Sequence, residues 1–141
     1  MKRLSSFLIY LSIGCLSLLL FLLLFESQVQ VPAWLQIVGR MHPLFLHFPV
    51  ALLVFSSISL FFSQSIFGSH ASLKTFGEWG LLLSAVTSCS TALMGFLLSR
   101  EPGYDAESLF WHKWSGIIVS AGSLLIYFFR GARSEEHTSE L

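Results

Sequence analysis

Long stretches without a charged residue alternate with short polar segments along the whole chain. The first uncharged stretch runs from Leu4 to Phe25, directly after two basic residues. A helix needs about 20 apolar residues to cross a hydrocarbon core about 30 Å thick, so this stretch can span a bilayer. It is too long for the apolar region of a cleavable signal peptide and has no small-residue cleavage motif before Glu26. We therefore predict an uncleaved first membrane helix at about residues 4–25.

Three further apolar stretches follow, each bounded by polar residues or a turn signal. A mixed linker precedes the first of them, and residues 34–38 of this linker are expected to form a short interfacial helix. Residues 64–77, which contain glycine, serine, histidine and lysine, are predicted to be a polar loop. These boundaries predict the remaining membrane helices at about residues 43–62, 79–99 and 112–129.

The last helix has a more specific start signal. Pro102-Gly103 marks a turn, and Asp105 is suited to accept hydrogen bonds from the first free N–H groups of a helix that begins at Ala106. Trp111 and Trp114 lie near the predicted membrane boundary, where tryptophan is enriched. We expect a helix that enters the bilayer after one or two exposed turns.

Small residues recur every four positions in the third predicted helix, and such stripes let membrane helices approach closely. They are Ser84, Ser88 and Ala92, with Thr87, Thr91 and Gly95 beside them, and the fourth helix offers Gly116 and Ser120. The predicted fold is therefore an all-α, integral membrane, antiparallel helix bundle with about four transmembrane helices, in residues 1–132.

The last nine residues, 133–141, resemble the translation of a sequencing adapter. We predict that they are an artefact and that the chain is a fragment of a longer protein that continues beyond about residue 132. The alternative is an ordinary polar tail. They are left out of the fold prediction, as other non-native segments would be.

Composition supports a membrane protein and argues against several other classes. Of the 141 residues, 54% are apolar and only 11% are charged, compared with about 25% charged residues in soluble domains. The formal net charge is zero and there is no long basic run, so no nucleic-acid partner is expected. Cys15 and Cys89 form no metal or haem-attachment motif and are interpreted as packing residues. No hydrolytic or phosphate-binding motif is present, so we do not expect an enzyme.

Lysine and arginine in the short loops indicate the orientation, because they favour the cytoplasmic side. We predict a multi-pass protein of the bacterial inner membrane with a cytoplasmic N-terminus, since a basic pair precedes the first helix. This puts four basic residues inside (Lys2, Arg3, Lys74, Arg130) and three outside (Arg40, Arg100, Lys113).

Three histidines, His42, His47 and His112, are then expected at the outer ends of the second and fourth helices, with His70 on the opposite side. Ionisable residues at membrane depth usually have a function. Imidazoles from facing helices hold haem iron in membrane cytochromes, so His47 and His112 are candidate ligands to the iron of a b-type haem, and His42 is a third candidate cofactor-binding residue.

Other interpretations of these histidines stay open. His42 could be an interfacial residue before a proline, and His112 could extend its side chain toward the interface beside Lys113. His47 and His112 could instead form a hydrogen-bonded polar pair without a cofactor. A proton relay or a metal site is a further alternative, although no acidic residue lies in any predicted span. Space for a flat macrocycle is expected beside Ala51 and Gly116, and Pro49 is expected to disturb the second helix.

The segment Arg40–Leu53, which contains His42-Pro43-Leu44 and His47-Phe48-Pro49, resembles the signature H-P-L-x-x-H-F-P-x-A-L-L. That signature belongs to an uncharacterised family of predicted bacterial membrane proteins, and a second block around Gly95–Ser99 and His112–Gly116 is also similar to it. In planctomycete- and Bacteroidetes-type members this region precedes a periplasmic cytochrome c domain. The resemblance implies that the three histidines are family positions, and that a further helix and such a domain would follow.

The leading hypothesis is an inner-membrane module of a respiratory or electron-transfer protein that binds haem b and serves a periplasmic cytochrome c domain or other redox protein. The alternative is a cofactor-free membrane anchor or scaffold. A small-solute carrier is a weaker third hypothesis, because no pair of broken helices occupies matching positions.

Overall fold

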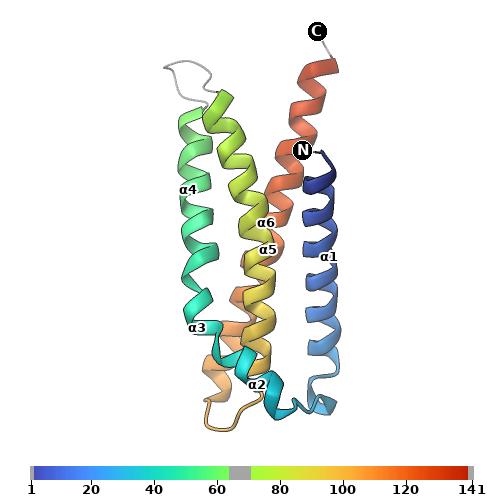
Figure 1. Ribbon diagram of the computed structural model, residues 1–141, viewed down its shortest axis with the longest axis vertical. Coiled ribbons are helices and arrows are strands. Elements are labelled where there is room, and N and C mark those ends of the chain that lie inside the picture. Colours follow the sequence, from blue (N-terminus) through green and yellow to red (C-terminus); the bar gives the residue numbers. More distant parts are fainter. Residues whose placement is uncertain (1, 64–70, 140–141) are drawn as a thin grey trace.

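The computed structural model describes residues 2–63 and 71–139, and these residues form helices joined by short connections, with no strand among them. Consecutive long helices run in opposite directions (Figure 1). Four segments are long and apolar enough to cross a membrane: Arg3–Leu24, Ala33–Ser63, Ala71–Leu98 and Glu107–Arg130. The predicted all-α membrane bundle is confirmed.

The helices follow the chain in a simple order. The short α2 confirms that the linker contains a helix, and a single turn, α3, joins it to the second long helix. The elements are α1 (Lys2–Leu24), η1 (Glu26–Gln28), α2 (Ala33–Arg40), α3 (His42–Phe45), α4 (His47–Ser63), α5 (Ala71–Leu98) and α6 (Ala106–Ser139).

The predicted polar loop at 64–77 is wrong in its second half, because α5 begins at Ala71 rather than near residue 79. The reason is tertiary packing. Gly77 lies so close to α4 that a Cβ atom on it would be 2.5 Å from Cγ of Leu60, and this contact outweighs the low helix propensity of glycine. Residues 64–70, including His70, lie outside the described residues.

The expected disturbance near Pro49 is present as a break between α3 and α4 at Leu46. Proline has no N–H, so Phe45 loses the hydrogen bond that a regular helix would give its carbonyl. The carbonyl of Pro49 itself accepts a hydrogen bond from Oγ of Ser84 on α5, at 3.0 Å. The helix entry is thus bent and tied to α5 within a few residues.

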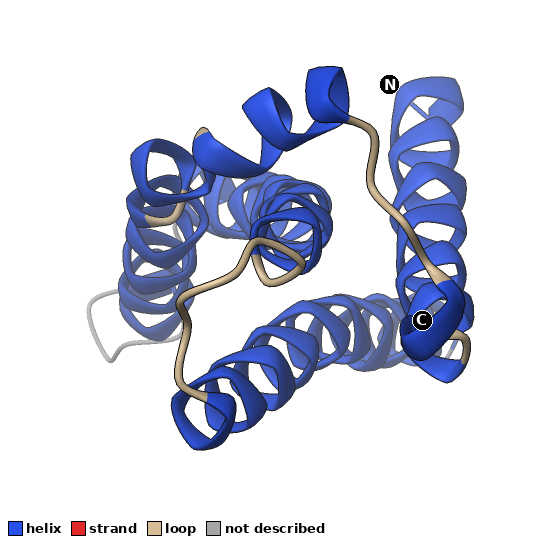
Figure 2. Ribbon diagram, turned by 90° about the horizontal axis from the view of Figure 1, so that it is seen from below, coloured by secondary structure: helices blue, strands red, loops and turns tan. Residues whose placement is uncertain are grey.

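Helix α5 is the centre of the bundle and packs against α1, α2, α3, α4 and α6. Seen along the bundle, it lies in the middle with the other long helices around it (Figure 2). The apolar core at the α1, α5 and α6 junction consists of Leu19, Phe96 and Ile117. Gly80 allows α4 to approach, because a Cβ there would overlap the Ser56 side chain. Small residues therefore set the α4–α5 distance, as expected for membrane helices.

The start of α6 is as predicted. Gly103 has a φ of 106°, a left-handed conformation that glycine adopts without strain. The Ser108 backbone N–H then donates to Oδ2 of Asp105 at 2.9 Å. This hydrogen bond to the ionised carboxyl lowers the pKa of Asp105. The helix itself is longer than the predicted apolar span, because it runs from Ala106 to Ser139.

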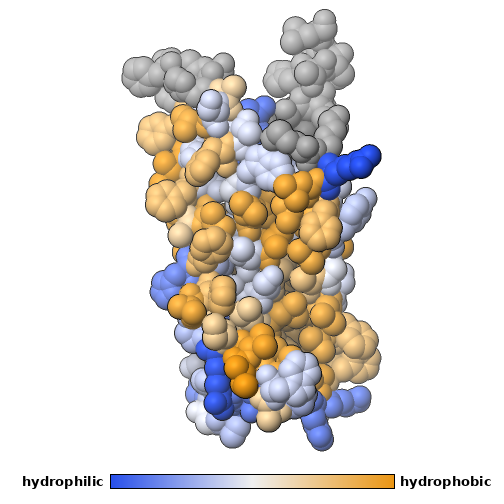
Figure 3. All heavy atoms as spheres, viewed as in Figure 1, coloured by the Kyte–Doolittle hydropathy of each residue, from blue (hydrophilic) through white to orange (hydrophobic). Residues whose placement is uncertain are grey.

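The outer surface of the bundle is apolar over most of its length. Many large apolar side chains face outward, among them Phe61, which is 75% exposed, and Phe129, which is 73% exposed. On the face drawn in Figure 3, the most hydrophilic atoms gather toward the two ends. A surface of this kind fits hydrocarbon rather than water.

Candidate functional site

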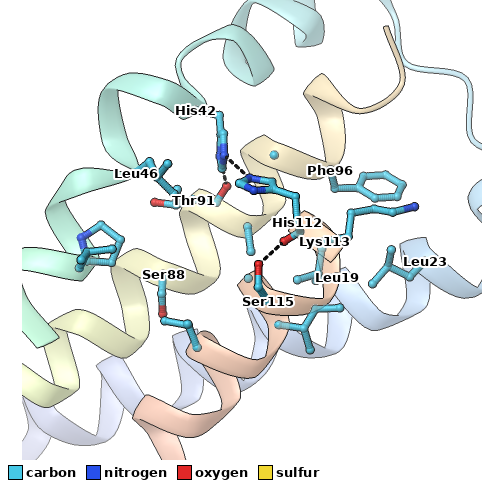
Figure 4. Close-up of a pocket in the computed structure, with 17 residues that line it drawn as sticks. Leu19, Leu23, His42, Leu46, Ser88, Thr91, Phe96, His112, Lys113 and Ser115 are labelled. Carbon is cyan, nitrogen blue, oxygen red and sulfur yellow. Dashed lines mark hydrogen bonds between the residues drawn. The ribbon is translucent and has the colours of Figure 1, made fainter. Parts of the chain in front are cut away.

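Two imidazoles from distant parts of the chain meet at the end of the bundle that carries α2. His42 begins α3 and His112 lies in the second turn of α6, and their Nε2 atoms are 3.2 Å apart (Figure 4). The ring planes are at 86° and the ring centroids are 5.4 Å apart. The difference between the centroid distance and the Nε2–Nε2 distance is about one ring radius for each imidazole. The two Nε2 atoms therefore lie almost on the line between the ring centres and point at each other.

The backbone of α5 fixes the orientation of His42. Its Nδ1 lies 2.8 Å from the carbonyl oxygen of Thr91. A carbonyl only accepts hydrogen bonds, so Nδ1 carries the proton. In a neutral His42, Nε2 is therefore an acceptor, and the Nε2–H of His112 donates to it. The pair has one defined tautomer at each ring.

Gly95 provides the space that His42 occupies. A Cβ atom at this position would lie 2.9 Å from Cε1 and 3.1 Å from Nδ1 of the imidazole. His42 is only 7% exposed, whereas His112 is exposed along one side. The first ring is held from three sides, and the second has freedom to move.

Two cavities adjoin at this pair, and both are lined by His42, Gly95 and His112. The inner cavity, of about 220 Å³, extends toward the membrane interior and is mostly apolar. Its further lining includes Leu19, Leu23, Val50, Ala92, Gly116 and Ile117. The outer cavity, of about 280 Å³, reaches the polar turn and is lined by Ser99, Tyr104, Asp105 and Ser108 among others.

The expected pairing of His47 with His112 is not what the structure shows. His47 is exposed and lines neither cavity. The break at Leu46 and the packing of α4 on α5 set the rotation of α4, and this rotation turns position 47 outward. His112 meets His42 instead. Of the two places expected to leave room, Gly116 lines the inner cavity, whereas Ala51 does not.

A cluster of charges lies at the same end of the bundle. Nζ of Lys113 is 2.7 Å from both carboxylate oxygens of Glu26, and Nη1 of Arg100 is 3.1 Å from Oε1 of the same residue. Arg40 pairs with Glu101 at 3.0 Å. The Glu101 side chain is only 16% exposed in this pair.

Two imidazoles are a donor set that could hold haem iron. In this structure their Nε2 atoms are 3.2 Å apart and in hydrogen-bond contact, so this contact would have to open before both could bind one ion. Together the two adjoining cavities fall within the roughly 300–1,000 Å³ of small-molecule sites, although each alone is smaller.

A zinc site built from several protein ligands is not formed by the part of the chain that the structure describes. No group of three or more His, Cys, Asp or Glu residues gathers there in positions that could hold an ion. Structural zinc sites use four such ligands and catalytic sites use three. The histidine pair thus offers two imidazole nitrogens, fewer ligands than either kind of zinc site uses.

The fold and the site together define a multi-pass membrane helix bundle with a polar histidine pair near one end. Within that class, residues 40–141 match the family described as "Predicted membrane protein (DUF2231)", and the chain belongs to this family. All three candidate histidines lie in the matched region. Searches among curated proteins and among solved structures found no match.

Sequence reasoning missed three participants in the site. The Thr91 carbonyl is invisible to side-chain patterns, and Gly95 was expected only to pack helices. Glu26 carried a usable signal, because it directly follows the first span and is predicted on the same membrane face as Arg100 and Lys113. A lone acid placed beside two basic residues is expected to pair with them.

Proposed function

We propose that this chain is a membrane module of an electron-transfer protein that binds a b-type haem between His42 and His112. The observation that carries the proposal is the head-on approach of the two Nε2 atoms, 3.2 Å apart, in an apolar surrounding with a cavity on each side. His42 and His112 would hold the haem iron through their Nε2 atoms, as imidazoles from facing helices do in helix bundles.

Each neighbouring residue has a role in this proposal. The Thr91 carbonyl holds the proton of His42 on Nδ1, which leaves Nε2 free as a ligand and makes it more basic. Gly95 makes room for the His42 ring, Gly116 leaves space along the inner cavity, and Leu19 and Ile117 exclude water from that cavity. Bound haem would supply one-electron transfer, and the chain would act as an electron carrier rather than an enzyme.

The partner is proposed from the position of the pair and from the family resemblance. Both histidines lie at the end of the bundle that the charge count places on the periplasmic side of a bacterial inner membrane. A periplasmic cytochrome c domain or another redox protein at this face would exchange electrons with the bound haem. The lipid bilayer remains the main surroundings of the chain.

A second candidate is a membrane anchor without a cofactor. The contact between His42 and His112 also supports this function, for a structural reason. The hydrogen bond between the rings satisfies both Nε2 atoms and joins α3 to α6. Interhelical hydrogen bonds of this kind are worth about 0.5–2 kcal/mol in membranes. In this case the pair would act as a structural link at the periplasmic end.

Absorption spectroscopy separates the two candidates. The chain is produced with haem supplied and purified in mild detergent, together with three variants, His42→Ala, His112→Ala and the matched control His47→Ala. We expect a Soret band of a six-coordinate haem in the wild type and the control, and its loss in the other two. A wild-type protein that folds but shows no Soret band would remove the haem proposal and leave the anchor.

A further inference from the structure

Arg100 and Lys113 share a single carboxylate oxygen beside the histidine pair. Nη1 of Arg100 and Nζ of Lys113 lie 3.1 and 2.7 Å from Oε1 of Glu26. Lys113 directly follows His112 and also lines the inner cavity. In Figure 4 its side chain extends away from the two rings. Lys113 therefore connects the wall of the inner cavity to the ion pairs of Glu26 and Arg100, which line neither cavity.

This cluster is not fully satisfied. Nε of Arg100 is buried and has no hydrogen-bond partner in the described part of the chain. Buried donors without a partner are uncommon, and a charged one is costly. The guanidinium can bind an oxyanion through two parallel N–H groups, but Glu26 engages only Nη1. Two positive charges face one negative charge, and one guanidinium N–H has no acceptor. One further oxyanion would balance the charge and accept that hydrogen bond.

We propose that Arg100 and Lys113 form an oxyanion subsite that takes a carboxylate of the bound haem, and that Glu26 holds the two cations until the haem enters. The inference rests on the proposed function, because it assigns the polar edge of the same ligand. Haem carries free carboxylates on one edge and is otherwise apolar, which matches a cationic rim on an apolar cavity.

When a haem carboxylate replaces Glu26 at the two cations, no charged group is left buried without a partner. Glu26 belongs to the short η1 turn at the membrane surface, and its side chain is 28% exposed. When the haem carboxylate binds the cations, Glu26 can turn to water and give up only a partly exposed ion pair. In the empty protein it prevents two neighbouring cations from repelling each other. Glu26 therefore competes with the ligand and sets its affinity.

Haem and its dimethyl ester provide the test, because the ester has the same ring and iron but no free carboxylate. Binding of each is titrated by Soret absorbance to the whole chain in detergent. Wild type is compared with Glu26→Gln and with Arg100→Met and Lys113→Met, which keep most of the apolar stem. Thermal unfolding checks that every variant is folded.

Wild type is expected to bind haem about tenfold more tightly than the ester, the effect of roughly one charge-assisted hydrogen bond. Glu26→Gln should increase this preference, because the competing carboxylate is gone. The two methionine variants should bind both compounds with nearly equal affinity. Opposite effects of Glu26→Gln and Lys113→Met cannot arise from a general loss of stability.

Three other outcomes are informative. Equal binding of haem and ester by the wild type and all variants would overturn the subsite and leave the haem proposal intact. No binding of either compound would overturn the proposed function itself. If wild type does not prefer haem to the ester, and anionic phospholipid at millimolar concentration raises the unfolding temperature of wild type but not of Lys113→Met, a lipid phosphate is the oxyanion that this subsite takes, and the assignment to haem is wrong.

Discussion

Gly95 of α5 lies so close to His42 of α3 that a single added methyl group would contact two atoms of the imidazole at 3.1 Å or less. The backbone of α5 thus fixes the ring on two sides, through this contact and through the Thr91 carbonyl. The position of His42 is therefore set by a helix that contributes no side chain to the histidine pair.

Replacement of Gly95 by alanine is expected to push the His42 ring off its present position. Overpacking of this kind costs about 1–3 kcal/mol, so the variant should unfold at lower temperature in detergent and lose haem affinity. Gly122→Ala is the control, because a Cβ there meets nothing within 4 Å. Equal melting temperatures for the two variants would contradict the close contact.

Ser84 links α5 to α4 through the carbonyl of Pro49. Ser84→Ala should lower the free energy of unfolding by about 0.5–2 kcal/mol, since an interhelical hydrogen bond inside the membrane is lost. Ser57→Ala is the matched control, because Ser57 is exposed and bonds only to Leu53 of its own helix. Steric trapping or chemical unfolding in bicelles measures both. A larger effect at Ser57 would show that the cross-helix bond has little weight.

The first turn of α6 should depend on pH through Asp105. Its pKa is lowered in the folded protein by the hydrogen bond from the Ser108 N–H. The stabilisation is therefore fully present above the unfolded-state pKa, and it is lost as the pH falls through the lowered folded-state pKa. The protection of the Ser108 amide against hydrogen exchange, measured relative to its intrinsic exchange rate at each pH, should fall over this acidic range in wild type. In Asp105→Asn the same amide should show no such transition.

Membrane orientation can be read from two engineered cysteines at opposite ends of the bundle. Tyr104→Cys lies in the turn before α6, and Lys74→Cys lies in the first turns of α5. With a cytoplasmic N-terminus, an impermeant maleimide should label position 104 in spheroplasts and position 74 only after permeabilisation. The reverse pattern would invert the proposed orientation and move the histidine pair to the cytoplasmic side.

The start of α5 shows that a local sequence pattern can predict the wrong secondary structure. Residues 71–77 contain a lysine, a serine and a glycine, and in isolation such a segment reads as a loop. In the bundle, Gly77 packs against Leu60, and Lys74 pairs with Glu78 one turn along the helix, at 3.9 Å. A partner helix that buries one face extends the helix beyond its apolar stretch.

The histidines show a similar limit. Counting the membrane spans was enough to predict that the histidines share one end of the bundle. The structure places His42 and His112 together at one end. Their pairing needs the rotation of each helix about its own axis. A change of one residue turns a side chain by about 100°, and the break at Leu46 resets that rotation between positions 42 and 47. No pattern in the chain carries this information.

The sequence by itself determined that the chain forms membrane-spanning helices, roughly where they lie, and which charged and imidazole side chains share an end of the bundle. The physical reason is that hydrocarbon thickness and the cost of unpaired polar backbone leave few alternatives for long apolar segments. Only the folded structure shows that His42 rather than His47 faces His112, and that Glu26 joins Arg100 to Lys113. The histidine contact depends on the close packing of α5 against α3 and α4 at Gly77, Gly80 and Gly95, where distances of a few tenths of an ångström choose between helix rotations that bury equally hydrophobic faces.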